Sequence, residues 1–157
     1  MHAPGHIGAA LLIYAPVATV VASVGFPRLA LYGLGLAVAV STVPDVDQFL
    51  QIEHRGFTHT VWFLLVLALL GAGVGWILGI SLGDPLAFTA VFGTAVGLSI
   101  LSHLLADSIT PMGIRPFTPF SEFHHSFELV RAANERANLA LFSVGSIATI
   151  FCYVVLF

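Results

Sequence analysis

The sequence predicts an all-helical integral membrane protein, a single domain over residues 1–157 folded as a polytopic bundle of about five transmembrane helices. Two observations lead to this prediction. Of the 157 residues, 58% are hydrophobic and only 8% are charged, with a mean hydropathy of +1.00, whereas soluble domains carry about 25% charged residues. The chain also contains five apolar runs, and a helix needs roughly 20 apolar residues to cross a bilayer. A soluble fold of this size could not bury so much apolar surface.

The charges and the single cysteine exclude other classes of protein. The chain has no lysine, and its five arginines against eight acidic residues give a net charge of -3, which speaks against a nucleic-acid-binding surface. Cys152 is the only cysteine, so no internal disulfide is expected. No positively charged segment precedes the first apolar run, and we therefore expect this run to remain as a transmembrane helix rather than to be cleaved as a signal.

The predicted spans end at turn-forming or polar residues. They are expected at about residues 7–24, 29–43, 57–80, 86–106 and 137–157. The second span is short and stops at Pro44. The loop between the fourth and fifth spans is the longest and contains Pro111, Pro116 and Pro119, which break helices.

Small residues at four-residue spacing predict where helices approach each other closely. Gly71, Gly75 and Gly79 form one such series, and Gly93 and Gly97 form another. Small side chains at this spacing allow close backbone contact in lipid. The alternative is that glycine is simply frequent in membrane helices.

Five spans place the arginines unequally on the two sides of the membrane. Arg55, Arg115, Arg131 and Arg136 fall on one side, and Arg28 falls on the other. The positive-inside rule makes the arginine-rich side cytoplasmic. The same side receives His2, His6, Asp45, Asp47, His54, His59, Asp107, His124, His125 and Glu128, with His103 one helical turn inside it. Hydropathy alone does not require this clustering.

Residues 44–59 concentrate polar groups between two apolar spans: Asp45, Asp47, His54, Arg55 and His59. The two carboxylates are two residues apart, so one could bind a cation while the other orients a ligand or holds a second cation. The alternative is a plain Pro-Asp turn. The guanidinium of Arg55 suits a phosphate oxygen, although anchoring at the membrane surface would explain it equally well.

Two further pairs have the spacing of one helical turn. His103 and Asp107 would lie on the same face of a helix and could bind one cation together; the alternative is a hydrogen bond from His103 to a neighbouring helix. His124 and Glu128 could bind another metal, but an amphipathic helix at the membrane surface, with nearby phenylalanines facing lipid, is the favoured interpretation.

The candidate metal ligands are His6, Asp45, Asp47, His59, His103 and Asp107. Imidazole with carboxylate suits a divalent ion, zinc first, with manganese or iron as alternatives. Six ligands exceed the need of one tetrahedral ion, and two ions sharing a carboxylate would activate water for attack at phosphorus. The candidate catalytic residues are Asp47, His54 and Arg55. One of Asp45 or Asp47 would accept the proton of the water, and Arg55 or Arg115 would hold the phosphate.

Three motifs in this order resemble those of the YdjM-like family of predicted inner-membrane metal-dependent hydrolases: Pro-Asp-x-Asp at 44–47, His-Arg-Gly-x-Thr-His at 54–59 and His-x-x-x-Asp at 103–107. The resemblance covers nearly the whole chain. That family is similar to the zinc-dependent phospholipases C and single-strand zinc nucleases, which cleave phosphate esters. The similarity implies, as metal ligands, His6, one of Asp45 or Asp47, His59, His103 and Asp107. Those soluble enzymes also carry Asp-x-x-x-Pro-x-His, whose last position is Gly113 here; His124 and Glu128 could partly replace it.

The resulting hypothesis is a hydrolase of phosphate esters embedded in the inner or plasma membrane, acting on a phospholipid or a lipid-linked phosphate. Membrane lipids are its expected partners, and no nucleic acid is expected. The alternative is a metal-binding membrane scaffold or regulatory protein without turnover, in which every coordination position is filled. A transporter would carry polar residues at the middle of its spans, whereas these spans are polar at one end only.

Overall fold

The computed structural model describes residues 1–50 and 52–156, with the backbone alone for residues 155 and 156. Throughout the described residues the chain forms helices and irregular segments, without strands. The long helices are α1 (Ala3–Ser23), α2 (Pro27–Val40), α4 (Val61–Leu82), α5 (Pro85–Ser108) and α6 (Glu135–Leu156). Counting α2 with the short turns that follow it, five helices in this part of the chain are long and apolar enough to cross a membrane. The predicted fold class is confirmed.

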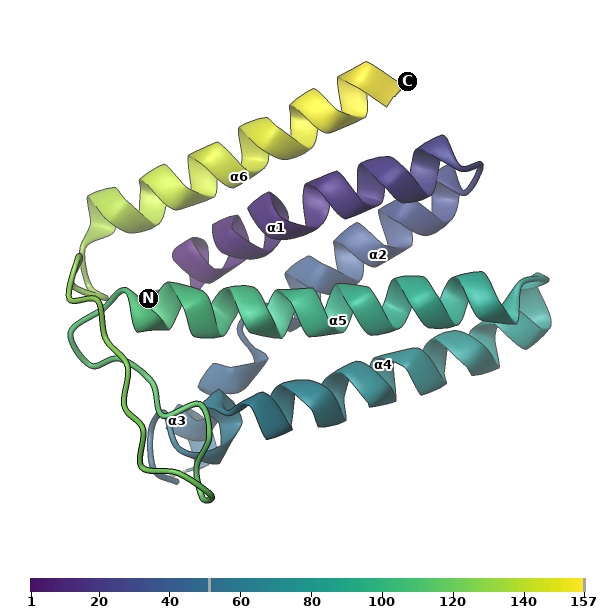
Figure 1. Cartoon of the computed structure of the whole chain (residues 1–157). Helices are drawn as coiled ribbons and strands as arrows, with labels where there is room; N and C mark the ends of the chain where they lie inside the picture. Colours follow the sequence, from purple (N-terminus) through teal and green to yellow (C-terminus); the bar gives the residue numbers. More distant parts are fainter. Residues whose placement is uncertain (51, 157) are drawn as a thin grey trace.

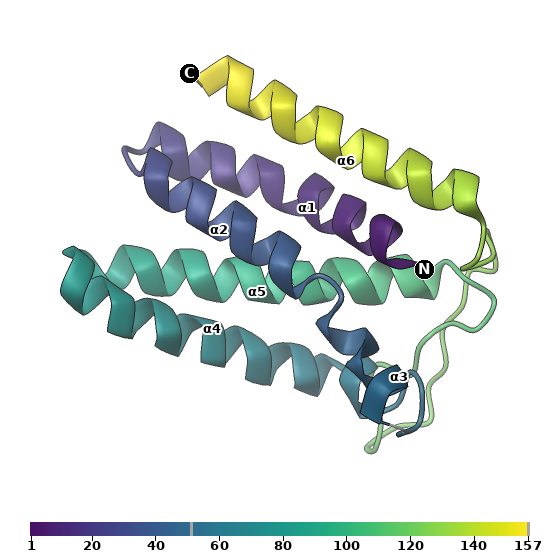
Figure 2. The same ribbon diagram turned by 180° about the vertical axis from the view of Figure 1, so that it is seen from behind.

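The long helices lie side by side in an elongated array (Figures 1 and 2). The helix α5 is central, because it packs against α4 on one side and against α1 and α2 on the other, while α6 packs on α1. Half of the α5 span is buried inside the protein, but only 17% of the α4 span and 11% of the α6 span. The outer faces of α4 and α6 therefore remain available to lipid.

Proline and capping side chains define where the helices begin. Pro27 and Pro85 stand in the first turns of α2 and α5, where a missing N–H costs no helical hydrogen bond. The Asp84 side chain accepts a hydrogen bond from the Ala87 N–H at 2.9 Å. At the other end of α4, Gly83 ends the helix with a φ of 104°, which favours glycine.

Two predicted spans differ at the end where the polar residues lie. The helix α2 ends at Val40 rather than at residue 43, and the chain continues through the 3-10 turn η1 (Val43–Val46) and the short α3 (Asp47–Leu50). The third span begins at Val61 rather than at residue 57, because η2 (Phe57–His59) is a separate turn. The predicted end of the last span, residue 157, lies outside the described residues.

The segment between α5 and α6 contains no helix among its residues 109–134. The i, i+4 spacing of His124 and Glu128 therefore does not correspond to a helix. His125 instead pairs with Ile114 in an isolated antiparallel bridge, and Glu128 adopts a φ of 54°. The prolines of this segment and the pairing of its two halves explain why a helical spacing did not produce a helix.

The glycine series of α4 lies against α5. A Cβ placed at Gly71 would come within 2.7 Å of Val96 Cγ2, and one at Gly75 would overlap the backbone of Phe88. The close approach of the two helices therefore depends on the absence of side chains along this stripe.

We expect Gly75→Ala to destabilise the protein by about 1–3 kcal/mol, because the added methyl group overpacks the α4–α5 contact. Gly73→Ala is the matched control, since nothing lies within 4 Å of a Cβ at that position. Titration from a mild detergent into dodecyl sulfate measures the free energy of unfolding. Equal effects of the two substitutions would contradict the packing described here.

Candidate metal centre

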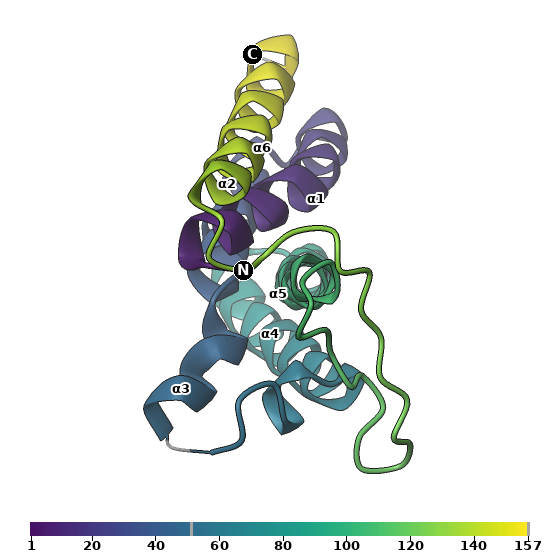
Figure 3. The same ribbon diagram turned by 90° about the vertical axis from the view of Figure 1, so that its left-hand side faces the viewer.

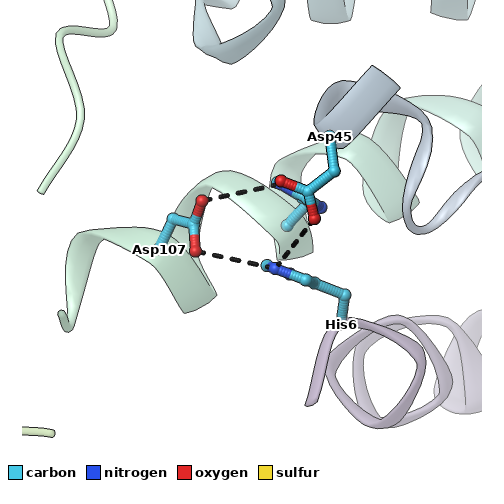
Figure 4. Close-up of side chains that lie close together, drawn as sticks. His6, Asp45 and Asp107 are labelled. Atoms are coloured by element: carbon cyan, nitrogen blue, oxygen red, sulfur yellow. Dashed lines mark ion pairs between the residues drawn. The ribbon is translucent and has the colours of Figure 1, made fainter. Parts of the chain in front are cut away.

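Five polar side chains from four separate segments converge at one end of the helix array, and we call them the His/Asp cluster: His6 of α1, Asp45 of η1, His59 of η2, and His103 and Asp107 of α5. Figure 4 shows His6, Asp45 and Asp107 pointing toward one another from three elements. Figure 3 views this end of the molecule. The side chains are buried, except that Asp45 is 18% exposed. The cluster therefore has one open side, at Asp45.

The local folding of each segment explains the convergence. His103 and Asp107 are four residues apart in α5, and their Nε2 and Oδ2 atoms lie 3.6 Å apart, as one helical turn allows. Thr60 caps α4 by accepting a hydrogen bond from the Phe63 N–H, and the η2 turn before it directs His59 inward. Asp45 follows Pro44 in η1, which carries the chain from the end of α2 across the end of α5.

His103 is held in one tautomer by the backbone of the preceding segment. Its Nδ1 lies 2.8 Å from the carbonyl oxygen of Ser41, and because a carbonyl can only accept, Nδ1 carries the proton. The other nitrogen, Nε2, then has a free lone pair. It faces His59 Nε2 at 3.2 Å, with Asp45 Oδ1 at 3.8 Å.

A relay of hydrogen bonds orients His59 in the same way. The Thr58 hydroxyl donates to Asp47 Oδ2 at 3.1 Å, so its oxygen accepts from the Nδ1–H of His59 at 3.0 Å. Burial disfavours the charged form of His59, but hydrogen bonding to Asp107 and Asp45 and the charge of Asp47 outweigh this and raise its pKa above the usual 6.5. Proton and metal therefore compete for the Nε2 of His59.

The contact between the two imidazoles needs either a proton on one Nε2 atom or a metal ion bound by both. In the neutral rings both Nε2 atoms carry lone pairs, and two lone pairs at 3.2 Å cannot form a hydrogen bond. Asp107 Oδ2 lies 3.3 Å from His59 Nε2, and with His59 neutral and protonated on Nδ1 this oxygen has no hydrogen-bond partner among the described residues. A buried carboxylate oxygen and two imidazole lone pairs directed at one point fit a divalent metal ion.

His6 completes the cluster from the first helix. Its Nε2 lies 2.9 Å from the carbonyl oxygen of Met1 and 3.6 Å from Asp107 Oδ1, and its ring stacks on that of His103 with centroids 3.6 Å apart. Because the Met1 carbonyl can only accept, this Nε2 carries a proton here, and binding a metal through it would replace the contact with Met1. His6, Asp45, His103 and Asp107 each offer one ligand atom, and these four atoms all lie within 4.8 Å of one another. This spread suits the coordination sphere of one small ion.

Asp47 lies behind His59, where it accepts hydrogen bonds from several donors. It is fully buried, and it accepts from the Arg55 N–H at 2.9 Å in addition to Thr58. Its other oxygen, Oδ1, lies 3.0 Å from Nδ1 of His54, which is 36% exposed. Asp45, Asp47 and His54 form a second group whose ligand atoms lie within 4.8 Å of one another. The sequence hypothesis of two ions sharing a carboxylate would therefore place Asp45 between them.

Arg55 is buried, and only 8% of its surface is exposed. Its Nη2 lies 2.9 Å from Asp107 Oδ1, and its Nη1 donates to the Thr110 hydroxyl at 2.9 Å and to the Gly113 carbonyl at 2.8 Å. Both terminal nitrogens of Arg55 therefore already have partners in the protein. Only its Nε–H lacks an acceptor among the described residues, so this is the one donor left for the predicted contact with a phosphate. The α-amine of Met1 also pairs with Asp107.

The remaining predicted groups lie around the cluster rather than in it. Arg115 pairs with Glu53 at 3.7 Å on the surface. His124 Nε2 lies 2.9 Å from the Met112 carbonyl and close to Gly113, where an added Cβ would come within 2.7 Å of it. A histidine at position 113 would therefore not fit this backbone.

Arg131 was not singled out from the sequence. It lines a pocket of about 430 Å³ together with Asp45, His54, Arg55, Met1 and His2. In the sequence, Arg131 is only an arginine on the predicted cytoplasmic side of the membrane. Anchoring by the positive-inside rule explains such a residue equally well.

Comparison with known proteins agrees with the resemblance of the motifs. The entire chain, residues 1–157, matches the family described as YdjM inner membrane protein. Neither the curated proteins nor the solved structures contain a match. Because the match spans every helix and every residue of the cluster, the chain belongs to the YdjM inner membrane protein family.

Proposed function

We propose that this protein is a metal-dependent hydrolase of phosphate esters whose substrate is a phospholipid or another lipid-linked phosphate. The observation that carries the proposal is the His/Asp cluster, in which the Nε2 atoms of His59 and His103 and the oxygens of Asp107 and Asp45 face one another. Imidazole and carboxylate ligands without thiolate favour zinc, with manganese or iron as alternatives. A divalent ion held there supplies a Lewis acid that lowers the pKa of a bound water.

The open side of the cluster favours an enzyme over a metal-binding scaffold. Asp45 is 18% exposed, and it lines the pocket of about 430 Å³. This volume falls within the range of roughly 300–1,000 Å³ found for small-molecule sites. A scaffold would close every ligand position, whereas here a substrate or water can reach the cluster at Asp45.

His54 is the group best placed to transfer protons. Its Nδ1 is paired with the buried Asp47, which orients the ring. The ring lies beside that of His59, with centroids 5.7 Å apart, and lines the pocket next to Asp45. We assign to His54 the role of general acid and base, and to Asp47 the role of orienting both His54 and His59.

Exposed phenylalanines at the cluster end support a lipid substrate. We call them the aromatic collar: Phe49, Phe57, Phe117, Phe120, Phe123 and Phe127, each at least 42% exposed. Phe120 also contacts Trp62 at the start of α4, with ring centroids 5.3 Å apart. The collar thus continues the apolar surface of α4 and suits insertion among lipid headgroups. The arginine bias of this end favours the cytoplasmic leaflet.

The test of this proposal is zinc-dependent turnover. We expect the purified protein in lipid nanodiscs to bind zinc and to release phosphate or an alcohol from soluble phosphodiesters or short-chain phospholipids. His54→Gln is expected to lower kcat by about 10²–10⁴-fold, because a general acid–base group is removed, while the ion held by the His/Asp cluster is retained. Phosphate release and metal analysis measure the two effects.

His125→Gln is the matched control, because His125 contacts Phe123 and Phe127 outside the cluster. Two outcomes would contradict the proposal: a zinc-loaded protein without turnover across both substrate classes, or a His54→Gln variant with the kcat of the wild type.

A further inference from the structure

The pocket beside the cluster is lined by one arginine without an ion pair. Of the five arginines, Arg55 is paired with Asp107 and Arg115 with Glu53, whereas Arg28 lies at the opposite end of the helices, at the start of α2. Arg136 is in the first turn of α6 and does not line the pocket. Arg131 lines the pocket, is exposed, and forms no ion pair with any described residue.

The other walls of the pocket carry groups that complement an anion. Arg55, more than nine-tenths buried, is also among the residues that line it. His54 lines it beside Asp45, the exposed member of the cluster. With a cation at the cluster, the charge of Asp45 is compensated, so the unpaired guanidinium of Arg131 leaves the pocket positive.

We propose that Arg131 is a substrate-positioning residue that binds the phosphate group of the substrate in this pocket, next to Asp45 and His54. The inference rests on the proposed function and adds an anion-binding residue to it. A guanidinium can donate two parallel hydrogen bonds to a phosphate, which fixes orientation as well as affinity. A free phosphate ester and the headgroup of a phospholipid share this chemistry.

Binding of inorganic phosphate to the full-length protein in nanodiscs tests the assignment. Isothermal titration is carried out with zinc-loaded and zinc-free protein, and zinc content is measured separately. We expect Arg131→Gln to weaken phosphate binding about tenfold or more, because a charge-assisted contact is lost. Arg131→Lys is expected to restore part of the affinity, since it keeps the charge without the fork.

Arg136→Gln is the matched control and should bind phosphate as the wild type does. Absence of phosphate binding in the wild type, unchanged affinity in Arg131→Gln, or equal weakening in Arg136→Gln would each overturn the role of Arg131. Failure of the wild type to retain zinc would instead overturn the hydrolase proposal, while an Arg131-dependent affinity in zinc-free protein would still support the anion site.

Two further ligands distinguish the source of the phosphate. Glycerol 3-phosphate represents a soluble ester, and dihexanoyl phosphatidic acid represents a lipid headgroup with short chains. Loss of affinity in Arg131→Gln for either ligand supports the site, and tighter binding of the lipid by the wild type assigns the phosphate to a headgroup. Where turnover is measured, Arg131→Gln should raise KM with a smaller effect on kcat.

Discussion

His103→Ala is expected to weaken zinc binding more than about 100-fold, and Asp107→Ala to do the same. Loss of a group that only orients a ligand costs about 10–100-fold in metal affinity, and these substitutions remove ligand atoms themselves. His103 Nε2 lies 3.2 Å from His59 Nε2, and Asp107 Oδ2 lies 3.3 Å from the same atom. Metal analysis of the purified proteins, followed by competition with a zinc chelator, measures the loss.

The control for this prediction is a histidine at the same end of the molecule but outside the cluster. His125→Ala should retain the metal content of the wild type, because His125 pairs with Ile114 through the backbone and contacts phenylalanine rings. Full metal content in both His103→Ala and Asp107→Ala would rule out the cluster as the metal centre.

The largest effect on stability is expected for Arg55→Met, which should lower the free energy of unfolding by about 3 kcal/mol. The substitution removes the guanidinium that lies 2.9 Å from Asp107 Oδ1 and leaves the Thr110 hydroxyl and the Gly113 carbonyl without this donor. A buried carboxylate that loses a partner is costly. Unfolding should be measured in the presence of a chelator, because a bound cation would compensate part of the charge of Asp107.

Arg115→Met provides the same chemical change on the surface. The Arg115–Glu53 pair is 59% and 77% exposed, and exposed pairs contribute only about 0–1 kcal/mol. If both variants lost the same stability, the buried position of Arg55 would have no special role.

The sequence was sufficient to predict the helices and the end at which the polar groups gather. Apolar runs long enough to span a bilayer leave few alternatives to helices. Two spans separate His6 from residues 44–59, and two more bring the chain back to His103, so all three lie at one side. The spacing of His103 and Asp107 likewise predicts a shared helix face, which α5 confirms.

The groups that orient the candidate ligands could not be predicted, because they depend on contacts between segments that are distant in the sequence. The Ser41 carbonyl that orients His103 is 62 residues away in sequence, and Asp47 supports His59 through Thr58 rather than from an adjacent helical turn. Arg55 has positive φ, a conformation that gives no signal in the sequence of a non-glycine residue. Likewise, nothing in the sequence marked Arg131 as lining the same pocket as Asp45.

The order of the ligands along the chain affects how the protein can assemble during synthesis. All five members of the His/Asp cluster precede residue 108, and α6 packs chiefly on α1 among the described helices. A growing chain that has delivered α5 to the membrane already holds the complete donor set. The cluster can therefore assemble before α6 packs on α1.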